Sequence, residues 1–136
     1  MGTERRGQAE PVQPVSSSAL DGISVTVSPV RENWLVVQVA GELDMVTSPA
    51  LRTAVIDASD EGCLASRTLV FDLTAVDFIG SSGLAVLAEA VQRAESASLP
   101  PIRVVVASRP VRRAVEVTGM DAVLAVFPDL DTATAD

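Results

Sequence analysis

The stretch Val76-Asp77-Phe78-Ile79-Gly80-Ser81-Ser82-Gly83-Leu84 stands where an apolar strand gives way to an amphipathic helix. Residues 68–73, just before it, form a nearly continuous apolar run, which is typical of a central strand covered on both faces. The apolar residues after it recur at helical spacing and predict one buried stripe: Leu84, Leu87, Ala88, Val91 and Ala94. Ser81 or Ser82 should therefore lie at or beside the N-cap of that helix.

The start of this helix is a chemically special position. Its first backbone N–H groups have no partner within the helix, and the positive end of the helix dipole lies there, so an oxygen is favoured and a phosphate more so. In one interpretation Ser81 and Ser82 only cap the helix, which is worth about 1 kcal/mol. In the other, one hydroxyl accepts a phosphate and acts as a switch, because the phosphate adds about −1.5 to −2 charges.

Strands and helices are predicted on both sides of this stretch. Residues 23–28 alternate apolar and polar side chains and residues 34–40 are mostly apolar, so together they predict a hairpin. Ser48 is the expected N-cap of a helix with Pro49 at its first helical position. The apolar stripe of that helix is Leu51, Ala54, Val55 and Ala58.

The second half of the chain repeats this alternation. Residues 102–107 predict another buried strand, and Ser108 is the expected cap of a third helix that ends at Gly119. Residues 123–127 are short and β-branched and predict a last strand.

The element order predicts a single α/β domain with a mostly parallel sheet of about five strands, an N-terminal hairpin and three to four helices. Residues 1–20 are expected to be a disordered tail, residues 21–128 the domain, and residues 129–136 a short tail or one helical turn. Ligands of open α/β sheets approach the carboxyl ends of the strands. Asp44, Asp77 and the serine pair follow such ends and should share one face.

The composition excludes several classes of function. The 136 residues include no His, Lys or Tyr and a single cysteine, Cys63. Histidine-based nucleophiles, Schiff-base chemistry, a phosphate-loop lysine and a thiolate zinc site are therefore excluded. We expect no catalytic residue, no metal ligand and no cofactor, and Cys63 is expected to be a thiol without a role.

Charge and hydropathy indicate the compartment and exclude some partners. The net charge is −8 and the pI about 4.4, which argues against nucleic acid and anionic membranes as partners. A single unpaired cysteine fits a reducing cytoplasm. No signal peptide and no apolar run long enough to span a bilayer is visible, so a cytoplasmic protein is expected.

Three segments in this order resemble the bacterial STAS domain, and more narrowly the single-domain anti-sigma-factor antagonists. They are Gly41-Glu42-Leu43-Asp44, residues 69–73 and residues 76–84. The similarity runs from about Ile23 to Phe127. The ordered combination is fairly specific, whereas Gly-Ser-Ser-Gly-Leu alone would be a weak signal.

The resemblance implies a partner-switching protein. In that family the unphosphorylated antagonist binds an anti-sigma factor that is also a serine kinase, and so frees a sigma factor. The kinase phosphorylates one serine at the start of the helix, the antagonist is released, and a serine phosphatase reverses the modification. Matched residue by residue, that serine falls on Ser82, with Ser81 as the second choice. The partner-binding residues implied are Asp44, Asp77, Gly80, Ser81, Ser82, Gly83 and Leu84.

Two positions leave alternatives open. Asp44 matches an acidic position on the family's binding surface, but it is equally well interpreted as a turn or capping residue. Gly80 stands where family members commonly carry Asp, which removes a charge beside the acceptor hydroxyl. The protein would then be either constitutively unphosphorylated or the substrate of a different kinase.

Two other classes of function, a sensor module and an enzyme, are alternatives to the antagonist. STAS-like domains also occur in transporters and sensors, so a nucleotide-binding or small-molecule-binding sensor module is the alternative. An enzyme is disfavoured because Gly-Ser-Ser-Gly is not the nucleophile-elbow motif and no His can serve as base. Asp44 and Asp77 without a third ligand are a poor cation site.

Arg112 and Arg113 are expected on a solvated face or against an acidic partner, and the chain is expected to be a monomer or weak dimer.

Overall fold

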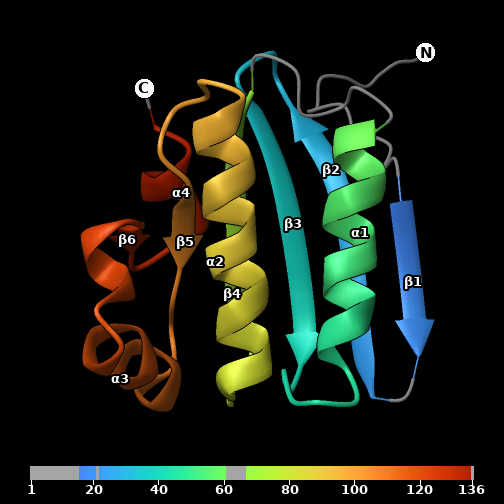
Figure 1. Cartoon of the computed structure of the whole chain (residues 1–136), viewed down its shortest axis with the longest axis vertical. Coiled ribbons are helices and arrows are strands. Elements are labelled where there is room, and N and C mark those ends of the chain that lie inside the picture. The colour runs from blue at the N-terminus through green and yellow to red at the C-terminus, as the bar shows by residue number, and fades with distance from the viewer. Residues whose placement is uncertain (1–15, 21, 61–66, 136) are drawn as a thin grey trace, which may run out of the picture.

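A computed structural model describes residues 16–20, 22–60 and 67–135 of the chain. The described residues form a six-stranded sheet in the order β1-β2-β3-β4-β5-β6, with four α-helices packed around it (Figure 1). Cys63 and residues 1–15 of the expected tail lie outside the described residues.

The sheet is mixed, as the sequence predicts. β1, β2 and β3 pair antiparallel, and β3 through β6 pair parallel, so the α/β class with an N-terminal hairpin is confirmed. The strands are β1 (Ser16–Leu20), β2 (Ile23–Val30), β3 (Trp34–Gly41), β4 (Thr68–Ala75), β5 (Arg103–Val105) and β6 (Ala125–Phe127). The helices are α1 (Ser48–Asp60), α2 (Ser81–Ser96), α3 (Arg109–Val117), the short 3₁₀ helix η1 (Met120–Ala122) and α4 (Leu130–Ala133).

Strand β1 was not predicted and lies within the stretch expected to be a tail. Its five residues pair with β2 from Ser16 opposite Val27 to Leu20 opposite Ile23. A run of three serines carries no apolar alternation, so no sequence pattern marked it. Backbone hydrogen bonding to the neighbouring strand can form with almost any side chain, and it is what defines this edge strand.

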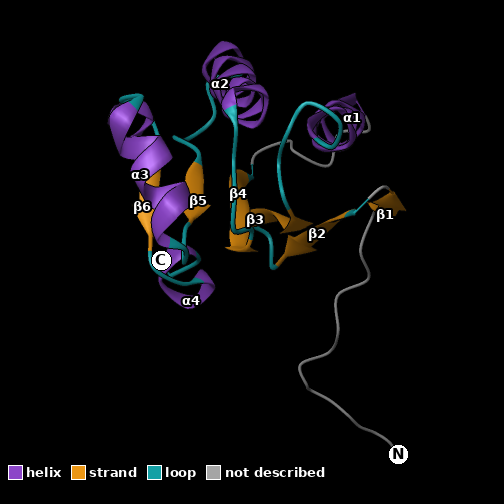
Figure 2. Cartoon of the chain, turned by 90° about the horizontal axis from the view of Figure 1, so that it is seen from below, coloured by secondary structure: helices purple, strands orange, loops and turns teal. Residues whose placement is uncertain are grey.

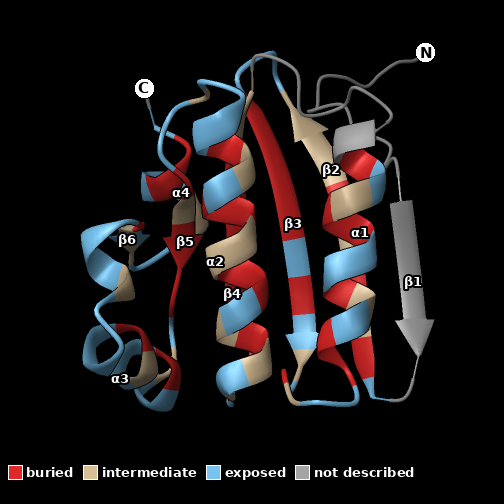
Figure 3. Cartoon of the chain, in the orientation of Figure 1, coloured by how far each residue is buried: buried red, intermediate tan, exposed pale blue. Residues whose placement is uncertain are grey.

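The helices cover the sheet unequally. Figure 2 shows α1 and α2 on one face and α4 on the opposite face. Figure 3 shows buried segments, in red, along β3 and recurring along α1 and α2 between exposed ones. The main core lies between those helices and the sheet, and its most buried side chains include Val25, Leu35, Val37, Leu51, Phe71, Leu73 and Leu87.

A second, smaller core lies between the sheet and α4. It contains Trp34, Val36, Val70, Val105 and Ala133. The guanidinium of Arg103 lies 4.7 Å from the Trp34 ring centroid and 5.2 Å from that of Phe127, and it donates a hydrogen bond of 2.9 Å to the Ala133 carbonyl. The C-terminal residues, expected as a tail or helical turn, therefore form a short helix that packs on the sheet.

Helix α2 faces the sheet with a slightly different stripe from the one predicted. The buried residues are Gly83, Val86, Leu87, Ala90, Val91 and Ala94, whereas Leu84 and Ala88 are partly buried. The α1 stripe, by contrast, is buried as predicted: Leu51, Ala54, Val55 and Ala58. None of the helices in the described part of the chain has both the length and the apolar character needed to cross a membrane.

Candidate functional site

The candidate site is built on two loops that follow the parallel strands β3 and β4. The Leu43 N–H donates a 2.9 Å hydrogen bond to the Phe78 carbonyl, and the Gly80 N–H donates one of 2.8 Å to the Leu43 carbonyl. Leu43 and Ile79 thereby form an isolated parallel bridge, and both side chains are buried. The loop carrying Asp44 and the loop leading to the serines are therefore held together as one unit.

Gly83 lets helix α2 approach this bridge. A Cβ atom at this position would lie 2.8 Å from Ile79 Cγ1 and 2.9 Å from Leu43 Cβ, closer than packed carbons tolerate. Gly83 itself is buried. Its part in the site is to bring the first turn of α2 against the bridge, and it offers no surface for a partner to touch.

The two serines occupy the first turn of α2. The N-cap is Gly80, with φ −94° and ψ −175° and no side-chain capping hydrogen bond, so the interpretation that the serines cap the helix is wrong. Ser81 is exposed and Ser82 is half-buried. The Ser82 hydroxyl lies 3.3 Å from the hydroxyl of Ser48, which was expected to cap α1 but is its first helical residue.

Asp44 organises the loop between β3 and α1. Its Oδ1 accepts hydrogen bonds from the Thr47 N–H at 3.0 Å and the Val46 N–H at 2.9 Å, and also from the Thr47 hydroxyl at 3.1 Å. These bonds, led by the one from the Thr47 backbone, lower the pKa of Asp44, so the carboxylate is charged at neutral pH. Asp44 therefore acts as a turn residue, while its Oδ2 makes no hydrogen bond within the described residues.

Two further acidic residues, Asp77 and Asp72, differ in their exposure to solvent. Asp77 is exposed on the loop before α2. Asp72, within β4, is buried and accepts hydrogen bonds from Thr74 and, at 3.3 Å, from Gln38, which is a structural role. No group of three or more metal-ligating side chains occurs in residues 16–20, 22–60 and 67–135.

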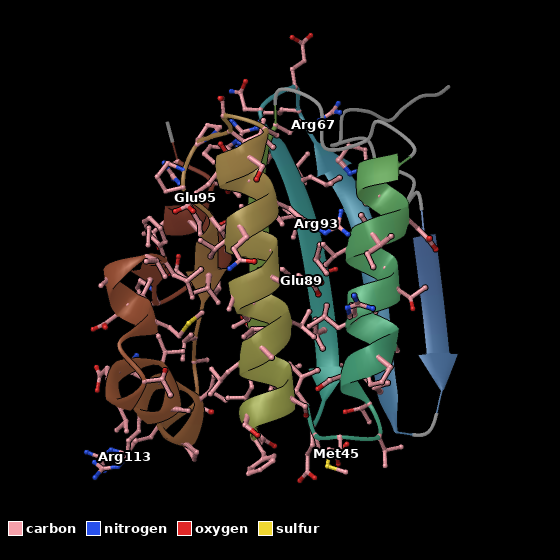
Figure 4. All side chains as sticks on the ribbon, viewed as in Figure 1. Met45, Arg67, Glu89, Arg93, Glu95 and Arg113 are labelled. Carbon is pink, nitrogen blue, oxygen red and sulfur yellow. The ribbon has the colours of Figure 1, made fainter. Side chains whose placement is uncertain are left out.

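Exposed apolar side chains lie on the two loops of the site, and no sequence pattern predicted their exposure. Met45 lines a groove together with Ser82, and the Phe78 ring lies next to Gly80. Met45, Val46 and Phe78 are 82%, 70% and 47% exposed. Figure 4 shows Met45 projecting from one end of the molecule, with Arg113 of α3 at the same end. The available sequence signal was the position of Met45, Val46 and Phe78 next to Asp44 and Asp77 in the two loops.

A groove leads from Ser82 along the contact between α1 and α2. It has a volume of about 590 Å³ and is lined by residues of both helices, among them Ser48, Ser82, Ala85 and Gln92. The Arg52 side chain pairs with Glu89 across it, with nitrogen–oxygen distances of 2.7 and 3.0 Å. This ion pair is solvent-exposed and contributes little to stability.

Substituting Gly80 with Asp is expected to stabilise the domain by about 0.5 kcal/mol, because Asp caps a helix better than Gly and its charge favours the helix N-terminus. The backbone is already extended, and a Cβ atom would meet the Phe78 ring at an ordinary 3.5 Å. Urea unfolding of the Gly80→Asp and Gly80→Asn variants separates the capping bond from the charge. A loss of stability in both variants would contradict this view of the N-cap.

The chain is similar to one family of known proteins over most of its length. The STAS domain family model matches residues 26–133. The chain is 33% identical over 116 residues to the anti-sigma-F factor antagonist RsfB of Mycobacterium tuberculosis, covering 85% of this chain and 90% of that protein. A crystal structure of an anti-sigma factor antagonist from Mycobacterium paratuberculosis is 37% identical, covers 85% of this chain and 94% of its own, and superposes with a TM-score of 0.68.

A more distant likeness concerns the fold alone. The phosphorylated form of SpoIIAA from Bacillus is 18% identical, covers 76% of this chain and 90% of its own, and has a TM-score of 0.56. The family match extends over most of the described residues and includes both loops of the candidate site. The chain belongs to the STAS domain family.

Proposed function

We propose that this chain is an anti-sigma-factor antagonist that binds an anti-sigma factor with serine kinase activity, and that phosphorylation of Ser82 releases it. The observation that carries the proposal is the position of Ser82, half-buried in the first turn of α2 and lining one groove with the exposed Met45. The relatives named as antagonists support the same assignment.

The docking face of this proposal has an apolar part and a polar part. Met45, Val46 and Phe78 would supply apolar contact area, because exposed apolar side chains gathered at one place are typical of interaction sites. Around them lie the predicted partner-binding residues Asp44, Asp77, Gly80, Ser81, Ser82 and Leu84. An uncharged Ser82 would fit such a face with little loss of hydration.

A phosphate on Ser82 would change this face without unfolding the domain. It adds about −1.5 to −2 charges and three acceptor oxygens, which the N-terminus of α2 can stabilise. A docked partner would have to desolvate that dianion near Asp44 and Asp77. Moving a complex from almost fully bound to almost fully free takes about 5.5 kcal/mol, and a buried, poorly paired phosphate supplies several kcal/mol of this.

The proposal predicts that an anti-sigma kinase transfers one phosphate from ATP to Ser82. Intact mass of the product, followed by fragment mapping, reports how many phosphates are added and where. The Ser82→Ala variant should accept none, the Ser81→Ala variant should still accept one, and a serine phosphatase should remove it. A phosphate mapped to another residue, or continued modification of Ser82→Ala, would contradict the assignment.

The α1–α2 groove is the observation that favours the alternative, a sensor of a nucleotide or small molecule. The groove opens beside Ser82, so a bound ligand would compete with a docked partner. Thermal stabilisation of the unmodified chain by a nucleotide, in the absence of any partner, would raise this alternative above the antagonist.

A further inference from the structure

Ser48 is a buried hydroxyl residue with an unusual neighbour. It is 2% exposed and begins α1, and its backbone N–H donates to the Asp44 carbonyl at 2.9 Å. Its hydroxyl lies 3.3 Å from the Ser82 hydroxyl, which is its one side-chain partner among the described residues. A side chain of α1 therefore contacts the Ser82 hydroxyl oxygen, which is the phosphorylated atom in the proposed function.

The direction of this hydrogen bond depends on the state of Ser82. In the unmodified protein either hydroxyl can donate, because each has a proton and two acceptor lone pairs. The dianion of phosphorylated Ser82 has no proton to donate, so in that state Ser48 becomes the only possible donor of the pair. Donors that favour the charged form of a group lower its pKa, and hydrogen bonds to charged groups are the stronger ones.

We propose that Ser48 is a positioning residue for the modification of Ser82. Its hydroxyl holds the Ser82 hydroxyl in one orientation before phosphorylation and donates to the phosphoserine oxygens afterwards. This inference rests on the proposed function, since it gives Ser48 a part in the same switch. Ser48 is too buried to be reached by a kinase itself, so it acts through Ser82.

The test places phosphoserine at position 82 during translation, so that no kinase is needed, and follows the phosphate by ³¹P NMR as the pH changes. We expect the Ser48→Ala variant to move the titration midpoint upward by about half a pH unit, because the dianion loses a donor. The matched control is Ser108→Ala, which removes the hydroxyl that caps α3 and accepts a 3.3 Å hydrogen bond from Val111. That control should leave the phosphate titration unchanged.

The charged groups around Ser82 stay the same in both variants. They are Asp44 and Asp77 on the two loops and the Arg52–Glu89 pair along the groove. A midpoint shift confined to Ser48→Ala therefore reports the lost hydroxyl. An unchanged midpoint in Ser48→Ala, or an equal shift in Ser108→Ala, would overturn the inference.

A second variant protects the test against a folding defect. Ser48→Cys keeps a side chain of similar length with a weaker donor, and its midpoint should fall between those of the parent protein and Ser48→Ala. A midpoint equal to that of Ser48→Ala in a folded Ser48→Cys variant would favour a merely structural role. Because the phosphate is installed without a kinase, a negative result here leaves the antagonist assignment standing. Conversely, failure of every kinase to modify Ser82 would not alter the titration.

Discussion

Replacing Ser82 with Asp is expected to weaken binding of the anti-sigma partner by about 30- to 1,000-fold, which corresponds to about 2 to 4 kcal/mol. The carboxylate would place a fixed charge at the half-buried hydroxyl position, in the groove that Met45 also lines. A docked partner would have to desolvate that charge. Isothermal titration calorimetry of the purified chain with the partner measures the loss directly.

The controls separate charge at this position from charge on the same helix. Ser96→Asp adds an identical carboxylate at the opposite, exposed end of α2 and should leave the affinity within about threefold of the parent protein. Ser82→Ala removes the hydroxyl without adding charge and should still bind. If Ser82→Asp also stayed within threefold, the hydroxyl would lie outside the interface.

The second large effect concerns the backbone before the Asp44 loop. Gly41 ends β3 with φ at +118°, a backbone conformation that residues with a Cβ atom rarely adopt. A Cβ atom at this position would also overlap the Gly22 carbonyl oxygen. Backbone strain and overpacking together predict that Gly41→Ala costs about 3 kcal/mol or more of the free energy of unfolding. Urea unfolding monitored by circular dichroism gives the value.

Gly119 provides the matched control for backbone strain alone. Its φ is +78°, but a Cβ atom would meet nothing within 4 Å. Gly119→Ala should therefore cost about 1 kcal/mol, the penalty of the left-handed conformation by itself. Equal losses in Gly41→Ala and Gly119→Ala would show that the close approach of β2 and β3 at Gly41 is not rigid.

Much of the fold could be predicted because local and tertiary preferences agree. The β4 run is apolar on both faces and lies in the middle of the sheet. Ser108, Gly119 and Asp129 mark helix ends through interactions within a few residues: Ser108 and Asp129 cap helices with their side chains, and Gly119 adopts a left-handed conformation. Such signals depend only on neighbouring residues, so the sequence contains them in full.

What could not be predicted depends on contacts between distant segments. The face that α2 turns to the sheet is shifted because Gly83 packs directly on the Leu43–Ile79 bridge, and Gly carries no apolar signal. The Ser48–Ser82 contact joins residues 34 positions apart, and a pattern of hydroxyls says nothing about which of them meet. The exposure of Phe78 likewise follows from the loop geometry rather than from its hydrophobicity.

In the proposed mechanism, the charge state of residue 82 controls a protein interface. The most direct measurement is the affinity of the anti-sigma partner for the same chain with serine and with phosphoserine at position 82. We predict 1:1 binding by the unmodified protein and at least about 100-fold weaker binding by the phosphorylated protein, with both remaining folded. Equal affinities of the two folded forms would contradict this mechanism.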